Sequence, residues 1–394
     1  MKFEFRNPTH LVFGAGTLSK LGEVASAHGK KALLVTGSGS VRRNGTLDRA
    51  LSSLHTAGVE TAECSGVEPN PRLSTVERGA AIARSEGCDV IVALGGGSTM
   101  DAAKVMAAAV FYEGDLWQMM AGQENRILPT KALPVVTVPT LAATGSEMNG
   151  GAVISNEKTT VKSFVSAPCL YPKDAIIDPE LTASVPPDQT AFGICDLITH
   201  VTESYFNGVD GTPLQDRFAE GVMLTAMEWG PKAIADGSDI EARTQVQWAS
   251  VVALNGWVQA GTLSPYPVHM IEHTLSAHHD IAHGAGLAIV NPAWMRFAAG
   301  TRPSRFAQFA HRIFGITLKT PEDPDAAAEG IDRFEAFLRS TGCPTRLSET
   351  GIGDRLLERY ASDTVLVAHD SEGRLPGRPP ISKSDIVDIL RSAL

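Results

Sequence analysis

The segment from Cys88 to Val110 restricts the possible folds more than any other part of this 394-residue chain. It predicts a short buried strand, three consecutive glycines at Gly95 to Gly97, and then a helix. Glycines at the end of a strand let a phosphate approach the backbone, and Ser98 with the first N–H groups of the helix can donate hydrogen bonds to it. The alternative is a tight turn without a ligand, although three glycines exceed what such a turn needs. The spacing is not that of the usual GxGxxG nucleotide motif.

Strands and helices alternate through the first half of the chain. The opening residues predict a strand with one buried face, because Phe3 and Phe5 alternate with charged neighbours. A short strand, a glycine turn and a helix to about Ala27 follow. Further strands are predicted at Ala32–Thr36, at Leu133–Val138 and in GAVIS, KSFVS and DAIID, and helices at Arg72–Glu86 and from about Leu47. This alternation predicts a parallel sheet covered by helices.

Predicted strands end near the sequence VPPDQ, at Val185 to Gln189. Helices are predicted by period and length at Gln189–Phe206, Pro213–Ala235, Ile240–Gln259, Pro303–Phe314, Asp325–Ser340, Glu349–Tyr360 and Ser382–Leu394. We therefore expect an α/β domain over residues 1–187 and an all-helical domain over residues 188–394.

Composition excludes several classes of partner. The formal net charge is −10, and no run of lysine or arginine is present, so we expect neither nucleic acid nor an anionic membrane surface as the main partner. No apolar stretch is long enough to span a membrane, and the first residues do not resemble a secretory signal. We expect a cytoplasmic protein. The five cysteines are scattered and form no CxxC pair, which argues against a disulfide framework and against a thiolate zinc site.

Five of the eleven histidines lie between residues 269 and 283. His273 follows His269 by four positions, so both imidazoles project from one face of a helix. Asp196 and His200 repeat that spacing upstream. Together with His283 they give a candidate set of four metal ligands: Asp196, His200, His269 and His283. Three imidazoles and one carboxylate suit zinc or ferrous iron and exclude neither.

The remaining histidines of this cluster have other interpretations. His278 and His279 are adjacent, so both cannot face inward on a helix, and we expect ordinary structural roles for them. His273 lies one turn from His269 and is our candidate catalytic residue. It is placed to relay a proton to the substrate, to act as a fifth ligand or to pack against His269, and the sequence leaves these three roles open.

Three separated segments, GGGSTMDAAK, PTLAATGSEMN and the Asp196, His200, His269 and His283 set, resemble the iron-containing (group III) alcohol dehydrogenases. The resemblance implies a Rossmann-like N-terminal domain and a helical metal domain, the architecture of dehydroquinate synthase. It implies NADP as cofactor and Fe²⁺ or Zn²⁺ as metal. Carried over residue by residue, it places the cofactor against Gly39, Ser40, Gly96, Gly97, Ser98, Asp101, Thr140, Thr144, Asn149 and Lys162.

Within that family the chain looks most like the NADPH-dependent aldehyde reductase and butanol dehydrogenase branch. We therefore expect a metal-dependent alcohol dehydrogenase that transfers hydride between NADP(H) and a primary alcohol or small aldehyde, as a homodimer. No carboxylate follows the second predicted strand until Asp48, whereas NAD-specific folds place an acid there to bind the ribose 2′-hydroxyl. Arg42 and Arg43 lie close enough in sequence to meet a 2′-phosphate, and a solvated role for one of them is the alternative.

Two alternatives stand beside this hypothesis. A lyase of the dehydroquinate synthase type would share the architecture, but a polyanionic substrate calls for lysine and arginine, and residues 245–290 contain neither. A non-catalytic metal-binding protein would explain the histidines and would leave Gly95 to Ser98 without a purpose.

Overall fold

The computed structural model describes residues 2–394, which divide into two compact units. One unit comprises residues 6–186 and 236–251, and the other comprises residues 187–235 and 252–394 with the N-terminal residues up to Phe5. The sequence-based ranges, 1–187 and 188–394, differ from this division mainly in residues 236–251. These residues include most of helix α8 (Ile240–Leu254). They group with the first unit, where Val251 lies in a hydrophobic cluster with Met148, Ala175 and Ile177.

The first unit is built on a six-stranded parallel sheet in the order β1-β8-β5-β4-β2-β3. The central strands are apolar runs that are buried on both faces, as a parallel sheet covered by helices requires. The strands are β1 (His10–Phe13), β2 (Lys31–Gly37), β3 (Glu60–Val67), β4 (Val90–Gly95), β5 (Val135–Pro139) and β8 (Asp174–Ile177).

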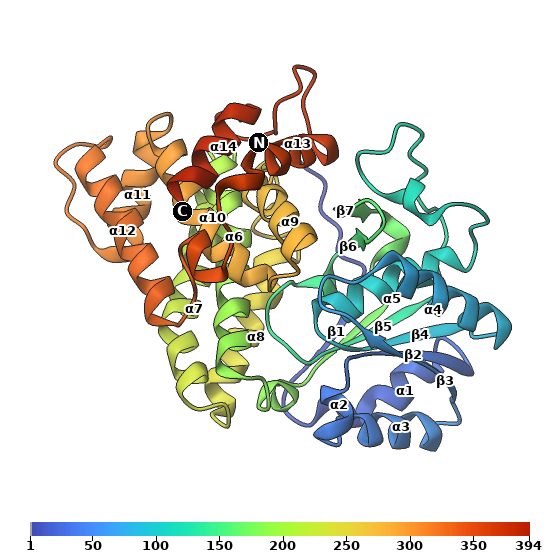
Figure 1. The fold of residues 1–394 in the computed structure, drawn as a ribbon. Coiled ribbons are helices and arrows are strands. Elements are labelled where there is room, and N and C mark those ends of the chain that lie inside the picture. Colours follow the sequence, from blue (N-terminus) through green and yellow to red (C-terminus); the bar gives the residue numbers. More distant parts are fainter. Residues whose placement is uncertain (1) are drawn as a thin grey trace. The chain divides into compact units, whose positions relative to one another are not determined.

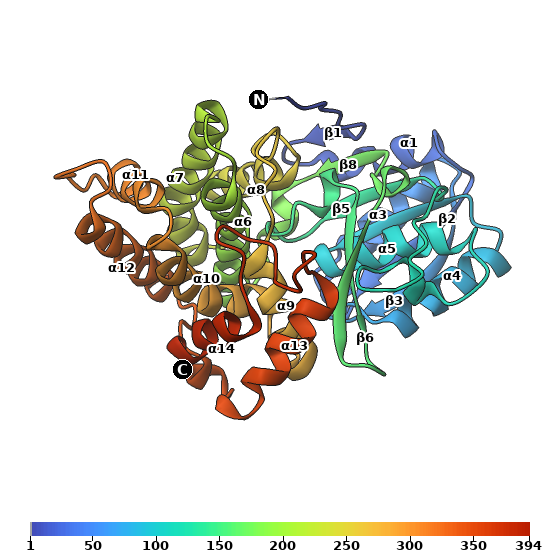
Figure 2. The ribbon, with the colours of Figure 1, turned by 90° about the horizontal axis from the view of Figure 1, so that it is seen from above.

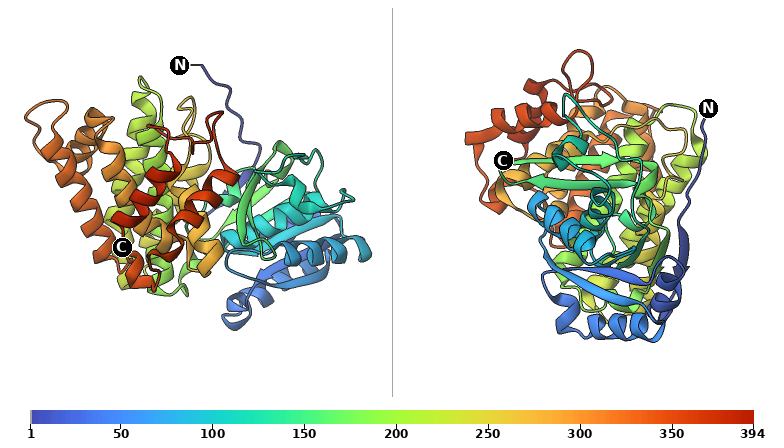
Figure 3. Two further views of the ribbon diagram at one scale, coloured as in Figure 1. Left: turned by 45° about the horizontal axis from the view of Figure 1, so that its top comes forward. Right: turned by 90° about the vertical axis from the view of Figure 1, so that its right-hand side faces the viewer.

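Helices cover both faces of this sheet. α1 (Leu21–Ser26), α2 (Ser40–Arg43) and α3 (Thr46–Thr56) lie below it in Figure 1, and α4 (Leu73–Ser85) and α5 (Gly97–Ala109) lie above it. A separate antiparallel pair, β6 (Gly151–Asn156) and β7 (Val161–Ser166), appears as the two green arrows in the right panel of Figure 3. The predicted α/β class with a parallel sheet is confirmed.

The second unit is built of helices joined by loops and contains no named strand among its described residues. Its longest buried helix is α6, in which almost every side chain from Thr190 to Asn207 is inaccessible to solvent. α10 contacts α6, α9 and α12, and α13 contacts α9 (Figure 2). The helices are α6 (Pro187–Asn207), α7 (Pro213–Ala235), α9 (Pro267–His279), α10 (His283–Ala299), α11 (Pro303–Phe314), α12 (Pro324–Ser340), α13 (Leu357–Val367) and α14 (Lys383–Ser392). Within residues 2–394, no helix combines the length and the apolar character that a membrane span needs.

Some local predictions are wrong. Residues 2–9 form no strand, because the first segment that pairs with a neighbouring strand begins at His10; Phe5 instead packs edge-on against Trp257, with 6.0 Å between the ring centroids. The predicted helix at 349–360 is displaced, since Glu349 lies in a 3-10 turn and α13 begins at Leu357.

Elements β3, α2 and α10 were not predicted, and α2 is a helix of only four residues. β3 carries glutamates and small residues and has little apolar alternation. α10 contains two glycines in its first turn and Pro292 in its interior, which hide its helical character in the sequence.

Two glycines of α7 provide a matched test of the packing between α6 and α7. A Cβ at Gly230 would lie 2.8 Å from Ile194 Cδ1, whereas a Cβ at Gly221 would meet nothing within 4 Å. We expect Gly221→Ala to raise the free energy of unfolding by about 0.5–1 kcal/mol, because alanine loses less backbone entropy on folding. Gly230→Ala should lower it by about 1–2 kcal/mol through overpacking. Urea unfolding of both variants measures the difference, and equal stabilisation by the two substitutions would contradict this packing.

Candidate metal centre and cofactor loops

The four predicted metal ligands converge on one carboxylate oxygen in the helical unit. α6 supplies Asp196 and His200, α9 supplies His269, and α10 begins at His283. Asp196 Oδ1 lies 3.4 Å from His200 Nδ1, 3.5 Å from His269 Nε2 and 4.0 Å from His283 Nε2. Residues that are as much as 87 positions apart in the chain therefore present their donor atoms to one small volume.

The donor atoms at the centre of this cluster are buried and lack hydrogen-bond partners. Within the described part of the chain this holds for Asp196 Oδ1, His200 Nδ1 and His269 Nε2. A buried polar atom without a partner costs roughly 1–3 kcal/mol, so three at one point need an explanation. One carboxylate oxygen and two imidazole nitrogens, within 4.8 Å of one another, are a donor set that zinc and ferrous iron bind. The residues present therefore fit the divalent ion predicted from the sequence.

The charges of the cluster are strongly coupled. Burial would raise the pKa of Asp196, but the neighbouring imidazoles, His200 first, lower it to about 2. Burial lowers the pKa of His200 to about 4, which keeps that imidazole neutral. Burial would lower the pKa of His269 as well, but the charge of Glu203 and the neighbouring carboxylate of Asp196 raise it to about 10. The neighbouring carboxylates thus favour the positively charged form of His269, which is the sign of charge that a bound cation would supply.

Two further buried carboxylates touch the imidazoles from outside. Glu203 Oε2 pairs with His269 Nδ1, and Glu272 Oε2 pairs with His283 Nδ1. Both glutamates are fully buried. Our sequence analysis missed them, although the signal was present: Glu203 follows His200 by three residues and Glu272 follows His269 by three, so each shares a helical face with a predicted ligand.

His273 lies beside the cluster. Its side chain is buried, and its ring centroid is 5.6 Å from that of His283. Glu272, His273 and His283 form a second group whose donor atoms lie within 4.8 Å of one another. The structure therefore places His273 where each of the three roles considered from the sequence remains open.

His278 and His279 point away from the cluster and bind α13. His278 Nε2 lies 2.8 Å from Asp363 Oδ2, and His279 Nε2 lies 2.5 Å from the Tyr360 hydroxyl. These contacts join α9 to α13 and are the structural roles expected for the two residues.

The predicted cofactor residues of β2, β4 and β5 share one edge of the parallel sheet. Gly39 and Ser40 follow β2, Gly96 to Ser98 follow β4, and Thr140 follows β5. β2 and β5 are the two neighbours of β4, so these carboxyl-terminal loops lie side by side. This edge is where open α/β sheets bind their ligands.

The three glycines at the end of β4 have different structural roles. A Cβ at Gly95 would lie 2.4 Å from Thr99 Oγ1, and a Cβ at Gly97 would lie 2.3 Å from Thr144 Cγ2, so packing alone requires both glycines. A Cβ at Gly96 would meet only Leu141, at the ordinary distance of 3.7 Å. Gly96 caps the N-terminus of α5 and is therefore the glycine of the three that packing does not explain.

Three other predicted cofactor residues are tied to the protein itself. Asp101 accepts hydrogen bonds from the Ser146 hydroxyl and the Val153 amide. The Asn149 amide group bonds to Gly145, Gly151 and Lys104. Lys162 donates to Asn70 Oδ1 at 2.8 Å. Asp101 and Asn149 thereby hold the loop that carries Thr144, through Ser146 and Gly145. All three residues stay predicted cofactor contacts.

Sequence analysis also missed two buried charged residues behind that loop. Burial lowers the pKa of Lys104 to about 8 and raises the pKa of Glu147 to about 7, and the two groups attract each other. Each follows a predicted cofactor residue in the sequence by three positions, Lys104 after Asp101 and Glu147 after Thr144.

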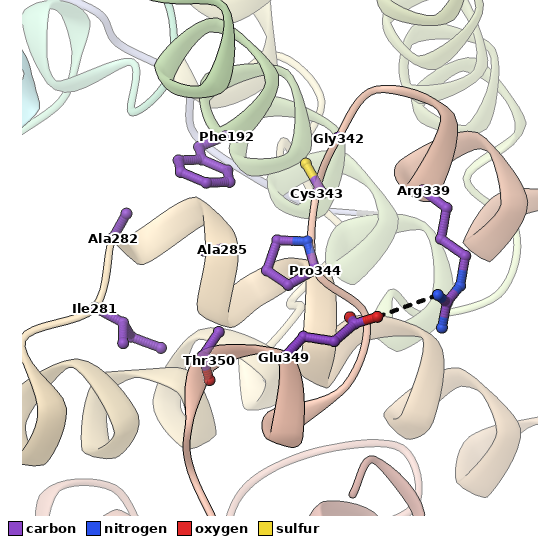
Figure 4. Close-up of a pocket in the computed structure, with 10 residues that line it drawn as sticks. All are labelled: Phe192, Ile281, Ala282, Ala285, Arg339, Gly342, Cys343, Pro344, Glu349 and Thr350. Carbon is purple, nitrogen blue, oxygen red and sulfur yellow. Dashed lines mark hydrogen bonds and ion pairs between the residues drawn. The ribbon is translucent and has the colours of Figure 1, made fainter.

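A pocket of about 670 Å³ opens elsewhere on the helical unit. Figure 4 shows Phe192, Ile281 and Ala282 on one side of the pocket and the ion pair between Arg339 and Glu349 on the other. In that pair Arg339 Nη1 lies 3.3 Å from Glu349 Oε1. None of the predicted metal ligands or cofactor residues lines this pocket. Its wall includes Ala282, the residue that precedes the predicted ligand His283.

Comparison with known families gives two matches that together cover nearly the whole chain. Residues 8–179 match the model of the iron-containing alcohol dehydrogenases, and residues 190–394 match the C-terminal model of the same family. The two matches meet in the segment that joins the two units.

Individual relatives agree with this assignment. The chain is 40% identical over 392 residues to a probable NADH-dependent butanol dehydrogenase of Bacillus subtilis, covering 100% of this chain and 99% of that one. It is 36% identical to an NADPH-dependent aldehyde reductase of Escherichia coli, with 89% of each chain covered. A solved structure of NADH-dependent butanol dehydrogenase A from Thermotoga maritima superimposes with a TM-score of 0.95 at 39% identity, covering 100% of this chain and 98% of that one. With both units matched and the fold reproduced, the chain belongs to the iron-containing alcohol dehydrogenase family.

Proposed function

We propose that this alcohol dehydrogenase works chiefly as an NADP-dependent aldehyde reductase, with one divalent ion held by Asp196, His200, His269 and His283. The observation that carries the proposal is the convergence of the imidazole nitrogens on Asp196 Oδ1. Within the described residues, Asp196 Oδ1, His200 Nδ1 and His269 Nε2 are buried and lack hydrogen-bond partners. Family membership sets aside the lyase and the non-catalytic metal-binding protein that the sequence had left as alternatives.

The protein residues divide the work of the reaction. When bound, the ion supplies a Lewis acid that polarises the carbonyl, and the nicotinamide supplies the hydride. The four ligands orient the ion, and the loops after β2, β4 and β5 bind the cofactor. His273 supplies a proton to the substrate oxygen as the aldehyde becomes the alcohol, because an imidazole can give a proton near neutral pH and recover it from water.

The identity of the ion follows from the donors only in part. Three imidazoles and one carboxylate suit Fe²⁺ and Zn²⁺ alike, and we propose that either ion binds. We further propose a homodimer that acts in the cytoplasm on small aldehydes or primary alcohols, with neither nucleic acid nor membrane as partner. The net charge of −10 supports the expectation that neither nucleic acid nor an anionic membrane is a partner, and the five free cysteines fit a reducing cytoplasm.

The preference for NADPH is proposed from the loop after β2. Gly37 to Ser40 carry no acid that could bind the ribose 2′-hydroxyl. Arg42 pairs with Glu63 at 3.0 Å, whereas a Cβ at Gly39 would lie 3.3 Å from Arg43 Nη1. Arg43 is therefore the arginine that we assign to the 2′-phosphate. The relatives' own names include both NADH-dependent and NADPH-dependent enzymes, so the proposal depends on this loop.

Cofactor preference gives the first test. We expect kcat/KM with NADPH to exceed that with NADH by at least about tenfold, or ~1.4 kcal/mol. Arg43→Ala should lower the NADPH value alone, while Arg42→Ala, the matched control, should have a smaller effect because Arg42 pairs with Glu63. Gly37→Asp should shift preference toward NADH, since a Cβ there meets only ordinary contacts at 3.5 Å or more. Equal efficiency of the wild-type enzyme with both cofactors would contradict the proposal.

The metal requirement gives the second test. His269→Ala removes one of the central donors, so we expect loss of the bound ion and of turnover, while NADPH fluorescence still reports cofactor binding. His278→Ala is the control on the same helix, because that imidazole binds Asp363 instead. Metal content per chain and NADPH oxidation are measured on the same samples. A metal-free wild-type preparation with full activity would refute the mechanism.

The role of His273 gives the third test. For a proton relay, His273→Phe and His273→Ala should keep wild-type metal content and NADPH affinity while kcat falls by roughly 10²-fold, the lower end for general acid catalysis. Loss of metal in these variants would identify a ligand. An unchanged kcat across the pH range would leave only packing.

A further inference from the structure

Each of two predicted ligand imidazoles is bound at its far nitrogen by a fully buried glutamate. Glu203 Oε2 meets His269 Nδ1, and Glu272 Oε2 meets His283 Nδ1. The Nε2 atoms of both rings then face Asp196 Oδ1, at 3.5 and 4.0 Å. Two independent imidazoles on different helices thus have the same orientation, with a carboxylate on one side and the donor cluster on the other.

Both glutamates are held in place by the protein. The other oxygen of Glu203 accepts the Val268 amide at 2.5 Å, at the start of α9. The other oxygen of Glu272 accepts the Ser276 hydroxyl. Fixed carboxylates of this kind determine which nitrogen of an imidazole carries the proton and which keeps its lone pair.

The space that Glu272 occupies depends on a glycine of α10. A Cβ at Gly286 would lie 2.7 Å from both Cγ and Oε1 of Glu272. Gly286 follows His283 by three residues, so it faces α9 from the same side of α10 as the ligand. The glycine leaves room for the carboxylate that orients the imidazole one turn away.

We infer that Glu203 and Glu272 are positioning residues of the metal centre. Each accepts a hydrogen bond from the Nδ1–H of its histidine and so presents the Nε2 lone pair of His269 or His283 to the ion. Gly286 and Ser276 keep the Glu272 carboxylate in position. The inference depends on the proposed role of these histidines as ligands. Loss of such an outer carboxylate typically lowers metal affinity by about 10–100-fold.

The test measures Zn²⁺ and Co²⁺ affinity of the metal-stripped full-length protein by competition with a chelator. Glu272→Gln and Glu203→Gln should each bind about 10–100-fold more weakly than wild type, because an amide can donate to Nδ1 and favour the wrong tautomer. Gly286→Ala keeps the carboxylate but displaces it, so it should weaken binding in the same direction. The absorption spectrum of the Co²⁺-loaded variants should also change, which a purely structural role would not produce.

Asp363→Asn is the matched control. Asp363 is a buried carboxylate paired with His278, another imidazole of α9, which is not a predicted ligand. Its loss should leave metal affinity and the Co²⁺ spectrum unchanged. Should Asp363→Asn weaken binding as much as Glu272→Gln, the effect would be a general loss of α9 stability and the inference would be wrong.

The remaining outcomes separate this inference from the proposed function. If His269→Ala loses the ion while Glu203→Gln, Glu272→Gln and Gly286→Ala bind it like wild type, the positioning role is wrong and the metal centre stands. If wild type itself binds neither ion, both are overturned. Should a glutamine variant fail to fold, Gly286→Ala and Ser276→Ala, which retain the carboxylate, decide the result through the same affinities.

Discussion

The arrangement of the helical unit depends on the burial of Asp196. Its carboxylate is almost inaccessible on α6, and an ionised carboxylate is costly to remove from water unless charges or donors compensate it. Three helices supply the compensating groups: α6 carries His200, α9 carries His269, and α10 begins at His283. The relative positions of these helices are therefore fixed at one point by electrostatics, while packing around α6 supplies the remaining constraints.

The α/β unit depends on a different constraint, the close approach of backbone to side chain at the end of β4. Gly95 and Gly97 are needed because Thr99 and Thr144 occupy the space of a Cβ, so two of the three glycines would be present without any ligand. Gly96 lacks such a neighbour and caps α5. The motif thus combines a packing requirement with one position whose small size leaves backbone open to a phosphate.

The sequence predicted the parts of this structure that have a local period. The spacing of four residues placed Asp196 with His200 on one helical face, and buried apolar runs gave β2, β4 and β5. The spacing of three residues was not used, and Glu203 and Glu272 were missed for that reason. The strand predicted around Phe3 is absent. Alternation shows which side chains are apolar, but it does not show whether a neighbouring strand is available for pairing. The grouping of residues 236–251 with the α/β unit rests on contacts such as that of Val251 with Ala175, which no local pattern reveals.

Charge balance connects the predicted metal ligands to the stability of the helical unit. Asp196, Glu203 and Glu272 are three buried carboxylates, and residues 187–207 and 245–290, which carry them, contain no lysine or arginine. Burial raises the pKa of Glu203, so its ionised form depends on His269 beside it. A protonated His269 offsets one negative charge, whereas a divalent ion offsets two and also satisfies the donor atoms around Asp196. Because the ion would contribute more compensation than the proton that it replaces, we expect metal binding to stabilise the packing of α6, α9 and α10 as well as to prepare the site for chemistry.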